Sequence, residues 1–401
     1  MQICELATPA VLIERSRLTS NLSKMQAAVN ARGIRLRPHA KTHKSPEIAR
    51  LQIERGAVGI CCAKLGEAEV FADAGITDIR LPYPLNPVNA ERVFALADRV
   101  ALSFIVDDPA VAQDWSDLAE GRGRTLDVLI KVDVGFHRCG IDPDSAAAAG
   151  TVRAIASMPG LRFRGLLSHA GNGYHATSEG EARDVAAREA EILRDLASAS
   201  GVSCDEISVG ATPTARFSVN EPGITEMRPG NYAYFDRTQV ALGSASWADC
   251  ALTVLARVVS RPARDRVIFD SGSKTLTNDG ARGFTSMPGH GAVLRDLAGS
   301  EPDPSLLVER LSEEHATVRV LEGESKLRTG SLVRVVPNHS CVVSNLVDHV
   351  WLVDGDQVVE RLPVAARGKI TWRGVRGARR EGRGQPMGKI LSRPSAGRGM
   401  T

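Results

Sequence analysis

Eight short apolar runs, each followed by a stretch with helical periodicity, constrain the fold of this chain more than any other feature. The runs have the length and composition of strands, and the stretches between them have the spacing of amphipathic helices. The predicted strands are IRLRPHA (34–40), AVGICCAK (57–64), DIRLPYP (78–84), ALSFIVD (101–107), LDVLIKVDV (126–134), FRGLLSHA (163–170), EISVGAT (206–212) and EMRPGNYAY (226–234). Eight such units within about 230 residues predict an α/β fold, a (β/α)8 TIM-type barrel rather than an open doubly wound sheet.

The second half of the chain has a different pattern, with Val-rich runs separated by turn residues. These runs are CALTVLARVVSR (250–261), DRVIFDSG (265–272), ATVRVL (316–321), LVRVVPNHSCVV (332–343), HVWLVDG (349–355) and QVVERLPVAARG (357–368). We expect them to form the antiparallel strands of a smaller C-terminal domain. The predicted domains are a barrel at 8–240 and a β-rich, metal-binding domain at 241–369. The N-terminal residues 1–12 are expected to be part of the second domain. The Gly- and Pro-rich segment 273–312 is expected to form loops over a site.

The last segment, 370–401, is strongly basic. From Arg367 onward the chain has ten Lys or Arg residues and a single acidic residue, Glu381. The segment is rich in Gly and Arg and has little periodicity, so we expect it to be disordered. Its stretch 373–400 has no interleaved aromatic residues and no folded basic face is expected, so we do not expect a nucleic-acid partner.

Composition also limits where the protein works. The seven cysteines are odd in number and scattered, which fits reduced thiols better than a disulfide framework. The chain has no apolar run of about 18 residues, and its N-terminus lacks the basic and apolar regions of a signal peptide. We therefore expect a cytoplasmic protein that does not bind a membrane.

A cluster of basic and titratable residues, RPHAKTHKS (37–45), ends the first predicted strand. Barrel enzymes place their chemistry at the C-terminal ends of their strands. A lysine there can bind an anion or form a Schiff base with a carbonyl cofactor; the alternative is a solvated surface lysine. Neighbouring cations such as Arg37 and Lys44 would lower the pKa of Lys41 and favour the reactive neutral amine. His39 is another neighbour that tunes or positions Lys41, and His43 is open between a supporting role and proton transfer.

Two later strand ends have residues suited to a phosphate group. SVGATPT (208–214) forms a turn of backbone amides and hydroxyls around Thr212, and RPGNYAYFD (228–236) offers Gly230 and Asn231. Phosphate sites after the seventh and eighth strands recur in barrels. His169 ends the sixth predicted strand, at the same end of the barrel.

His339 and Cys341, in VVPNHSCVV, are two residues apart, so on a strand they would point to the same face. An imidazole and a thiolate side by side suit zinc or a similar borderline metal. Two ligands leave an open site, which suits catalysis better than a structural role. The alternative is a chance histidine beside a buried strand cysteine.

Taken together, these stretches resemble the D-threonine aldolase and D-serine dehydratase family, pyridoxal-phosphate enzymes with an alanine racemase-like fold. The resemblance spans residues 8 to about 369 and rests on TPAVLI, RPHAKTHKSPEIA, GICCAKLGEAE, VDVGFHRCG, HAGNGY, VGATPT, RPGNYAYFD, PNHSCVV and VAARG. It implies that Lys41 carries pyridoxal 5'-phosphate and that Arg138 lies near the cofactor ring. It also implies that the residues around the cofactor are Tyr174, Thr212, Gly230, Asn231 and Tyr232.

The resemblance further implies that His339 and Cys341 hold a divalent metal beside the substrate hydroxyl, with Zn2+ favoured and Mn2+ or Mg2+ as alternatives. The activity expected first is retro-aldol cleavage of a D-β-hydroxy amino acid, with His169 or a metal-bound hydroxide as the candidate base. Cys341 instead favours the alternative, dehydration of D-serine or 3-hydroxy-D-aspartate, because dehydratases of the family have a cysteine there. Ser168, where dehydratases more often have a bulky aromatic residue, argues for the aldolase. The resemblance also suggests a homodimer.

Two other classes of protein fit less well. An amino-acid racemase on the same barrel would need a catalytic tyrosine from the second domain, but the four tyrosines are residues 83, 174, 232 and 234. A non-enzymatic cofactor-binding protein would have no use for the pair of metal ligands.

Overall fold

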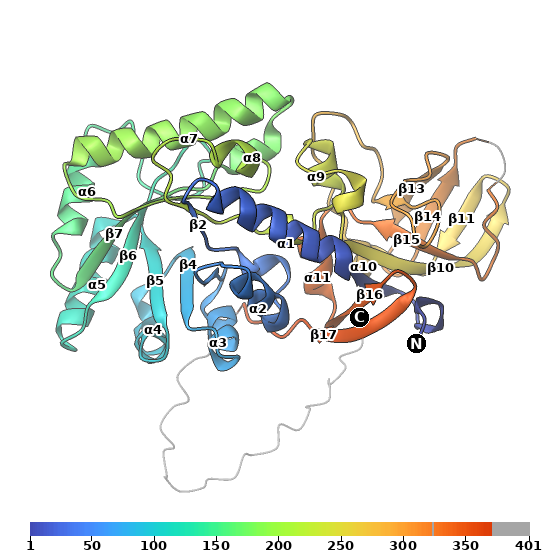
Figure 1. Cartoon of the computed structure of the whole chain (residues 1–401), viewed down its shortest axis with the longest axis horizontal. Coiled ribbons are helices and arrows are strands. Elements are labelled where there is room, and N and C mark those ends of the chain that lie inside the picture. Colours follow the sequence, from blue (N-terminus) through green and yellow to red (C-terminus); the bar gives the residue numbers. More distant parts are fainter. Residues whose placement is uncertain (323–324, 371–401) are drawn as a thin grey trace, which may run out of the picture.

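The computed structural model describes residues 1–322 and 325–370, in which two sheets divide the chain (Figure 1). The first is an eight-stranded parallel sheet in the order β2-β9-β8-β7-β6-β5-β4-β3. Its strands are β2 (Arg35–Leu36), β3 (Ile60–Cys61), β4 (Asp78–Pro84), β5 (Ala101–Val106), β6 (Leu126–Lys131), β7 (Leu161–Leu167), β8 (Glu206–Val209) and β9 (Glu226–Met227). Each lies within one of the eight predicted strands or overlaps it.

The two ends of this sheet meet and make it a barrel. Beyond β2 the chain continues alongside β3, where Val58 N–H donates to Leu36 O at 2.9 Å and Cys61 N–H donates to Pro38 O at 2.8 Å. A parallel bridge between His39 and Cys61 completes the closure. The predicted TIM-type barrel is therefore confirmed.

The eighth strand is shorter than the sequence suggests. β9 ends at Met227, two residues before Pro229, which has no N–H to continue the ladder. The rest of the predicted strand turns inward, and Asn231–Ala233 form the 3-10 helix η5.

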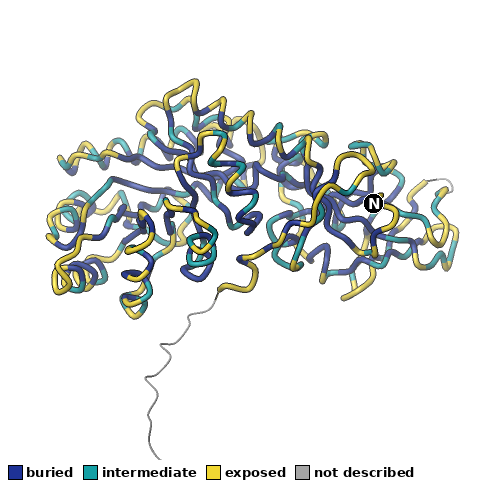
Figure 2. Tube along the Cα trace, turned by 60° about the horizontal axis from the view of Figure 1, so that its bottom comes forward, coloured by how far each residue is buried: buried dark blue, intermediate teal, exposed yellow. Residues whose placement is uncertain are grey.

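Helices cover the outside of the barrel and leave buried strands within (Figure 2). Helix α2 begins at Pro46, with Ser45 at its N-cap position. These helices are α2 (Pro46–Glu54), α3 (Leu65–Asp73), α4 (Ala90–Ala97), α5 (Pro109–Glu120), α6 (Ala148–Ala156), α7 (Glu179–Ser200) and α8 (Ala215–Ser218). Helix α9 (Arg237–Ala241) lies beside the second sheet instead (Figure 1). None of the helices in the described ranges is long and apolar enough to cross a membrane.

The second sheet is largely antiparallel and forms the C-terminal domain, as predicted. Its strands are β1 (Ala10–Glu14), β10 (Leu252–Ala263), β11 (Arg266–Phe269), β12 (Ala292–Val293), β13 (Leu306–Leu311), β14 (Ala316–Val320), β15 (Leu332–Val336), β16 (His349–Asp354) and β17 (Gln357–Pro363). The N-terminal strand β1 lies between β10 and β16. Helix α1 (Arg15–Asn30) then leads from this sheet to the barrel (Figure 1).

One predicted strand of this domain is wrong in its second half. LVRVVPNHSCVV forms β15 only as far as Val336, because Pro337 again cannot continue a ladder. His339 takes an extended conformation at the N-cap position of helix α11 (Ser340–Leu346). Helix α10 (Ser273–Leu276) follows β11. The predicted disordered tail lies outside the described residues, apart from Ile370.

Part of the barrel interior is a cluster of buried, paired charged side chains. Arg80 pairs with Glu206 (Nη2 to Oε2, 2.7 Å) and with Glu226, which also accepts from Arg37 Nε at 2.8 Å. Burial alone raises the pKa of Glu226, but Arg80 and Arg37 outweigh it and lower this pKa to about 2. Arg37 also pairs with Asp78, at the start of β4. Its guanidinium therefore points away from Lys41, and the expectation that Arg37 tunes that lysine is wrong.

Candidate active site

A cavity of about 890 Å³ lies where the carboxyl ends of the barrel strands face the second domain. The barrel contributes Lys41, His169 and Thr212 to its wall, and the second domain contributes Asp279 and His339. A cavity in this position is the usual place for a barrel enzyme's chemistry.

Lys41 lies in a short 3-10 turn, η2 (Ala40–Thr42), just beyond β2. His39 begins this turn and accepts a hydrogen bond from Lys41 N–H at 3.4 Å. Lys41 Nζ makes no ion pair with any residue that the structure describes. Burial lowers the pKa of Lys41, and the charges of Arg138 and Arg228 lower it further, against an opposing effect of Cys341. This shift is in the direction that a nucleophilic lysine needs.

The other basic residues of RPHAKTHKS have different positions. Lys44 lines the cavity and donates to Glu67 Oε1 at 3.0 Å and Asn345 Oδ1 at 2.7 Å. His43 points away from the cavity, into the helix α2 side, and lies 3.3 Å from Gln52 Oε1. Burial lowers the pKa of His43 to about 4. These contacts favour a supporting role for His43 over proton transfer.

His169 is held as a neutral base at the end of β7. Its Nδ1 is hydrogen-bonded to the carbonyl oxygen of Gly210, and a carbonyl can only accept, so Nδ1 carries the hydrogen. Burial, followed by the charges of Lys41 and Arg138, lowers the pKa of His169 well below its usual value. The unprotonated Nε2 is therefore available to accept a proton near neutral pH.

The residues predicted to hold a phosphate line one part of the cavity. The hydroxyl oxygen of Thr212 is buried and has no hydrogen-bond partner among the described residues. Gly230 allows a close approach of the backbone, because a Cβ there would lie 2.9 Å from both His39 O and Thr42 Oγ1. The Asn231 amide instead donates to Asp236 Oδ2 at 2.6 Å and to Ser340 Oγ at 3.1 Å, so its side chain faces helix α11 of the second domain. An unpartnered hydroxyl and an open backbone turn fit an anionic group.

Of the remaining residues predicted around a cofactor, only Tyr174 lines this cavity. Its hydroxyl is hydrogen-bonded to Gln239, and burial raises its pKa. Arg138 is exposed, with its guanidinium 5.3 Å from the ring centre of Phe136, which does line the cavity.

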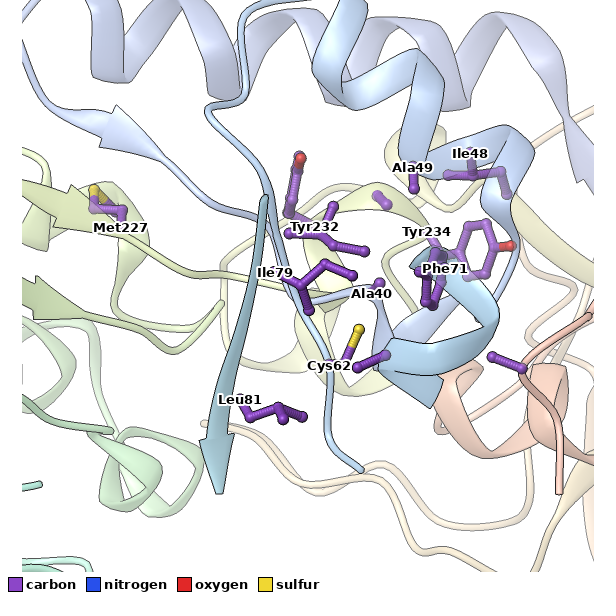
Figure 3. Close-up of a cluster of buried hydrophobic side chains, with 14 of the residues drawn as sticks. Ala40, Ile48, Ala49, Cys62, Phe71, Ile79, Leu81, Met227, Tyr232 and Tyr234 are labelled. Carbon is purple, nitrogen blue, oxygen red and sulfur yellow. The ribbon is translucent and has the colours of Figure 1, made fainter. Parts of the chain in front are cut away.

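The prediction for Tyr232 is wrong. Its hydroxyl accepts a hydrogen bond from Gln52 Nε2 at 3.0 Å, outside the cavity. Figure 3 shows its ring among buried apolar side chains that include Ile79 and Ala40. The 3-10 turn after β9, in place of a strand, directs this side chain into the core.

His339 and Cys341 both line the cavity, although they begin a helix instead of sharing a strand face. Burial opposes charge on both, but their mutual hydrogen bond outweighs it: the pKa of Cys341 is lowered, and that of His339 is raised to about 10 with help from Asp236 and Asp279. In the described ranges no group of three or more His, Cys, Asp or Glu residues could hold a metal ion. Within these ranges His339 and Cys341 therefore form a pair without a third such group placed to complete a metal site.

Two residues of the cavity escaped the sequence prediction. Arg228 is buried, donates from Nε to Ser208 Oγ at 2.7 Å, and lines the cavity. It begins the RPGNYAYFD motif, and the signal that the sequence offered was an arginine within a predicted strand that leads to the site. Asp279 lies in the segment 273–312, which was predicted to lie over a site; residues 278–282 do so, but nothing in the local pattern singles out this aspartate.

Comparisons with known proteins agree with this arrangement. Residues 13–238 match the alanine racemase N-terminal domain, and residues 251–353 match the serine dehydratase domain. The D-threonine aldolase of Arthrobacter sp is 34% identical over 91% of this chain and 94% of its own length. The D-threo-3-hydroxyaspartate dehydratase of Delftia sp. (strain HT23) is also 34% identical, over 84% of this chain and 91% of its own.

Solved structures give the same result. The Delftia dehydratase superposes with a TM-score of 0.84 at 30% identity, over 90% of this chain and 98% of that one. The D-threonine aldolase of Filomicrobium marinum superposes with a TM-score of 0.82 at 32% identity, over 92% and 98%. Alanine racemase of Clostridium difficile shares the fold at 14% identity, with a TM-score of 0.63. The chain therefore belongs to the alanine racemase N-terminal domain family, and a serine dehydratase domain follows the barrel in the sequence.

Proposed function

We propose that this protein is a pyridoxal phosphate- and divalent metal-dependent lyase that acts on D-β-hydroxy amino acids. The observation that carries the proposal is the meeting in one cavity of Lys41, whose pKa is lowered, with His339 and Cys341. Relatives named as aldolases and dehydratases of such substrates support it.

The residues present fit both groups. Lys41 would bond the cofactor aldehyde, Thr212 with the Gly230–Asn231 turn would hold its phosphate, and Tyr174 would lie beside it. His339 and Cys341 would hold the metal, and the thiolate favours Zn2+ over Mn2+ or Mg2+. When bound, pyridoxal phosphate supplies an acceptor for the electrons of a broken Cα bond, and the metal supplies a Lewis acid.

The first candidate reaction is the retro-aldol cleavage of D-threonine and related substrates. His169 Nε2 takes the proton of the β-hydroxyl, and the Cα–Cβ bond breaks. The β-carbon leaves as an aldehyde, and Cα takes up a proton to give glycine. The neutral state of His169 and its place on the cavity wall support this role.

The second candidate is dehydration, and Cys341 favours it. In this reaction the amine of Lys41 takes the proton from Cα, and the Cβ–O bond breaks to release water. Hydrolysis then gives a 2-oxo acid and ammonia from D-serine or 3-hydroxy-D-aspartate. The same cavity residues would serve both reactions, and the bond to Cα that breaks distinguishes them.

A racemase is the third candidate and has the least support. It needs an acid on the opposite face of the cofactor, and the four tyrosines of the chain all precede the second sheet's β10. We further propose a cytoplasmic homodimer, on the family resemblance; sedimentation of the purified protein measures its mass.

One assay separates these reactions. The holoenzyme is incubated with D-threonine and with D-serine, with and without a chelator, and the products are identified. Glycine with acetaldehyde supports the aldolase, pyruvate with ammonia supports the dehydratase, and L-amino acids support the racemase. Activity that the chelator leaves intact would contradict the metal site.

A further inference from the structure

Asp279 faces the cavity without a part in either reaction. It comes from the loop between α10 and β12, and its Oδ2 lies 2.6 Å from His339 Nδ1. Both side chains are about half exposed to the cavity mouth, at 46% for Asp279 and 42% for His339. We propose that Asp279 is a positioning residue, which holds His339 by Nδ1 so that Nε2 and the Cys341 sulfur face one divalent cation. The inference rests on the proposed metal-dependent function.

The contact fixes the tautomer of His339. A carboxylate accepts only, so Nδ1 carries the hydrogen between the two residues, and Nε2 is the nitrogen left for a metal. Histidines that bind metals commonly donate their second N–H to a carboxylate, which orients the ring and makes it a better ligand. The same hydrogen excludes a metal from the space between Asp279 and Nδ1.

One buried side-chain amide, that of Asn338, holds the main chain beside both Asp279 and His339. Asn338 directly precedes His339, is 1% exposed, and donates from Nδ2 to the carbonyl oxygens of Asp279 and Gly289, both at 2.9 Å. Its Oδ1 accepts from Arg237 Nη1 at 3.1 Å. The main chain on either side of the Asp279–His339 contact is thus held by one side chain, so the contact is built into the fold.

The loop also holds a conformation that costs free energy. Thr277 has a φ of 64°, a left-handed conformation that β-branched residues rarely adopt, and its Oγ1 accepts from Asp279 N–H at 3.1 Å. This bond begins the turn that brings Asp279 over the cavity.

A second His–Asp contact shows what a carboxylate with another purpose looks like. Asp133 lies 3.1 Å from His137 Nδ1, but its Oδ1 also accepts from three backbone N–H groups, and His137 is 85% exposed. That carboxylate stabilises a turn, whereas the side chain of Asp279 is hydrogen-bonded to His339 alone among the residues that the structure describes.

The test measures metal binding in the holoenzyme after a chelator has removed the metal. Zn2+ affinity is determined by competition with a chromophoric chelator for wild type, Asp279→Asn, Asp279→Glu and the control Asp265→Asn, which removes the same charge from the exposed β10–β11 turn. We expect Asp279→Asn to raise the Kd for Zn2+ by about 10–100-fold, Asp279→Glu to raise it less, and Asp265→Asn to leave it unchanged. Cofactor absorbance and thermal melting verify that each variant is folded.

Cobalt substitution separates a positioning residue from a ligand. At saturating Co2+ the visible d–d bands of Asp279→Asn should match those of wild type, because the coordination number is unchanged. Bands that change intensity as a ligand is lost would overturn the positioning role, as would an unchanged Kd for Zn2+. A wild-type protein that binds neither metal would overturn the metal-dependent function and this inference with it.

Discussion

Lys44 Nζ donates a hydrogen bond to Asn345 Oδ1 at 2.7 Å, and this bond joins helix α11 of the second domain to the turn that carries Lys41. A second bond close by, from the Ser344 hydroxyl to Thr42 O, joins the same two segments. The residues proposed to hold the cofactor and those proposed to hold the metal are therefore parts of one connected structure. A substitution among the proposed metal-binding residues should therefore also affect cofactor binding, and the reverse should hold.

The first prediction concerns the lysine that bonds the cofactor. Lys41→Ala should abolish the visible absorbance of the bound cofactor and lower kcat by about 10³-fold or more, because the amine is both anchor and base. Lys44→Ala is the matched control and should keep that absorbance. An absorbance lost in Lys44→Ala and kept in Lys41→Ala would assign the cofactor to the other lysine.

The second prediction concerns the base. Replacement of His169 by Asn should lower the aldolase kcat by about 10²–10⁴-fold while cofactor binding persists. The pKa of His169 is lowered in the folded protein, so protonation of this residue should affect kcat/KM only well below pH 6.5. An acid limb of the pH–rate profile that is the same in wild type and His169→Asn would argue against this base.

The third prediction concerns the metal. Cys341→Asp replaces a soft thiolate by a hard carboxylate at the same position, so the affinity for Zn2+ should fall relative to that for Mn2+. Competition titrations of both metals measure the ratio. The control is Cys4→Asp, which changes an exposed cysteine outside the cavity and should leave the ratio of Zn2+ to Mn2+ affinity unchanged.

The fourth prediction concerns stability and pH. The folded-state pKa of Glu226 is lowered to about 2, so its ionised form stabilises the fold above about pH 4.5, and this contribution is lost as the pH falls toward 2. Urea unfolding between pH 5 and 2 should show the loss, and Glu226→Gln should weaken this pH dependence. Arg80→Ala should cost roughly 3–5 kcal/mol at pH 7, because it leaves buried carboxylates unpaired.

The fifth prediction concerns the C-terminus. Deletion of 371–401 should leave activity intact, whereas deletion from Val364 onward should lower it, because Ala366 N–H donates to Lys44 O at 3.0 Å and Ile370 lines the cavity. The assay of both truncations, with D-threonine as substrate, is the measurement. A large loss in the shorter deletion would mean that the basic tail contributes to the site.

The sequence was sufficient for the barrel because eight strand patterns recur at helix-length intervals, a signal local to each unit. The prediction that His339 and Cys341 lie together was correct, but the reason given for it, a shared strand face, was wrong. The two residues lie at the start of helix α11, which also places residues two apart near one another. The carrier role of Lys41 stays a prediction.

The failures have a common physical origin. Whether Tyr232 faces the cavity or the core depends on a short 3-10 turn after Pro229, which alternation along a strand does not reveal. Arg37 turns toward Glu226 and Asp78, from strands distant in sequence, and only barrel closure brings them near. Asp279 gains its position from the amide of Asn338, 59 residues away.

The route of the chain also limits how the protein can move. In residues 1–322 and 325–370 it passes from the second sheet to the barrel after β1 and back after β9, and beyond β17 it returns to the barrel at Lys44. A hinge consists of a few loop residues that absorb the rotation of two bodies, and here such changes would be needed at three separate places at once. Substrates should therefore enter and leave through the fixed mouth of the cavity, so its width, and not a rate of domain opening, should set the largest β-substituent that the protein accepts.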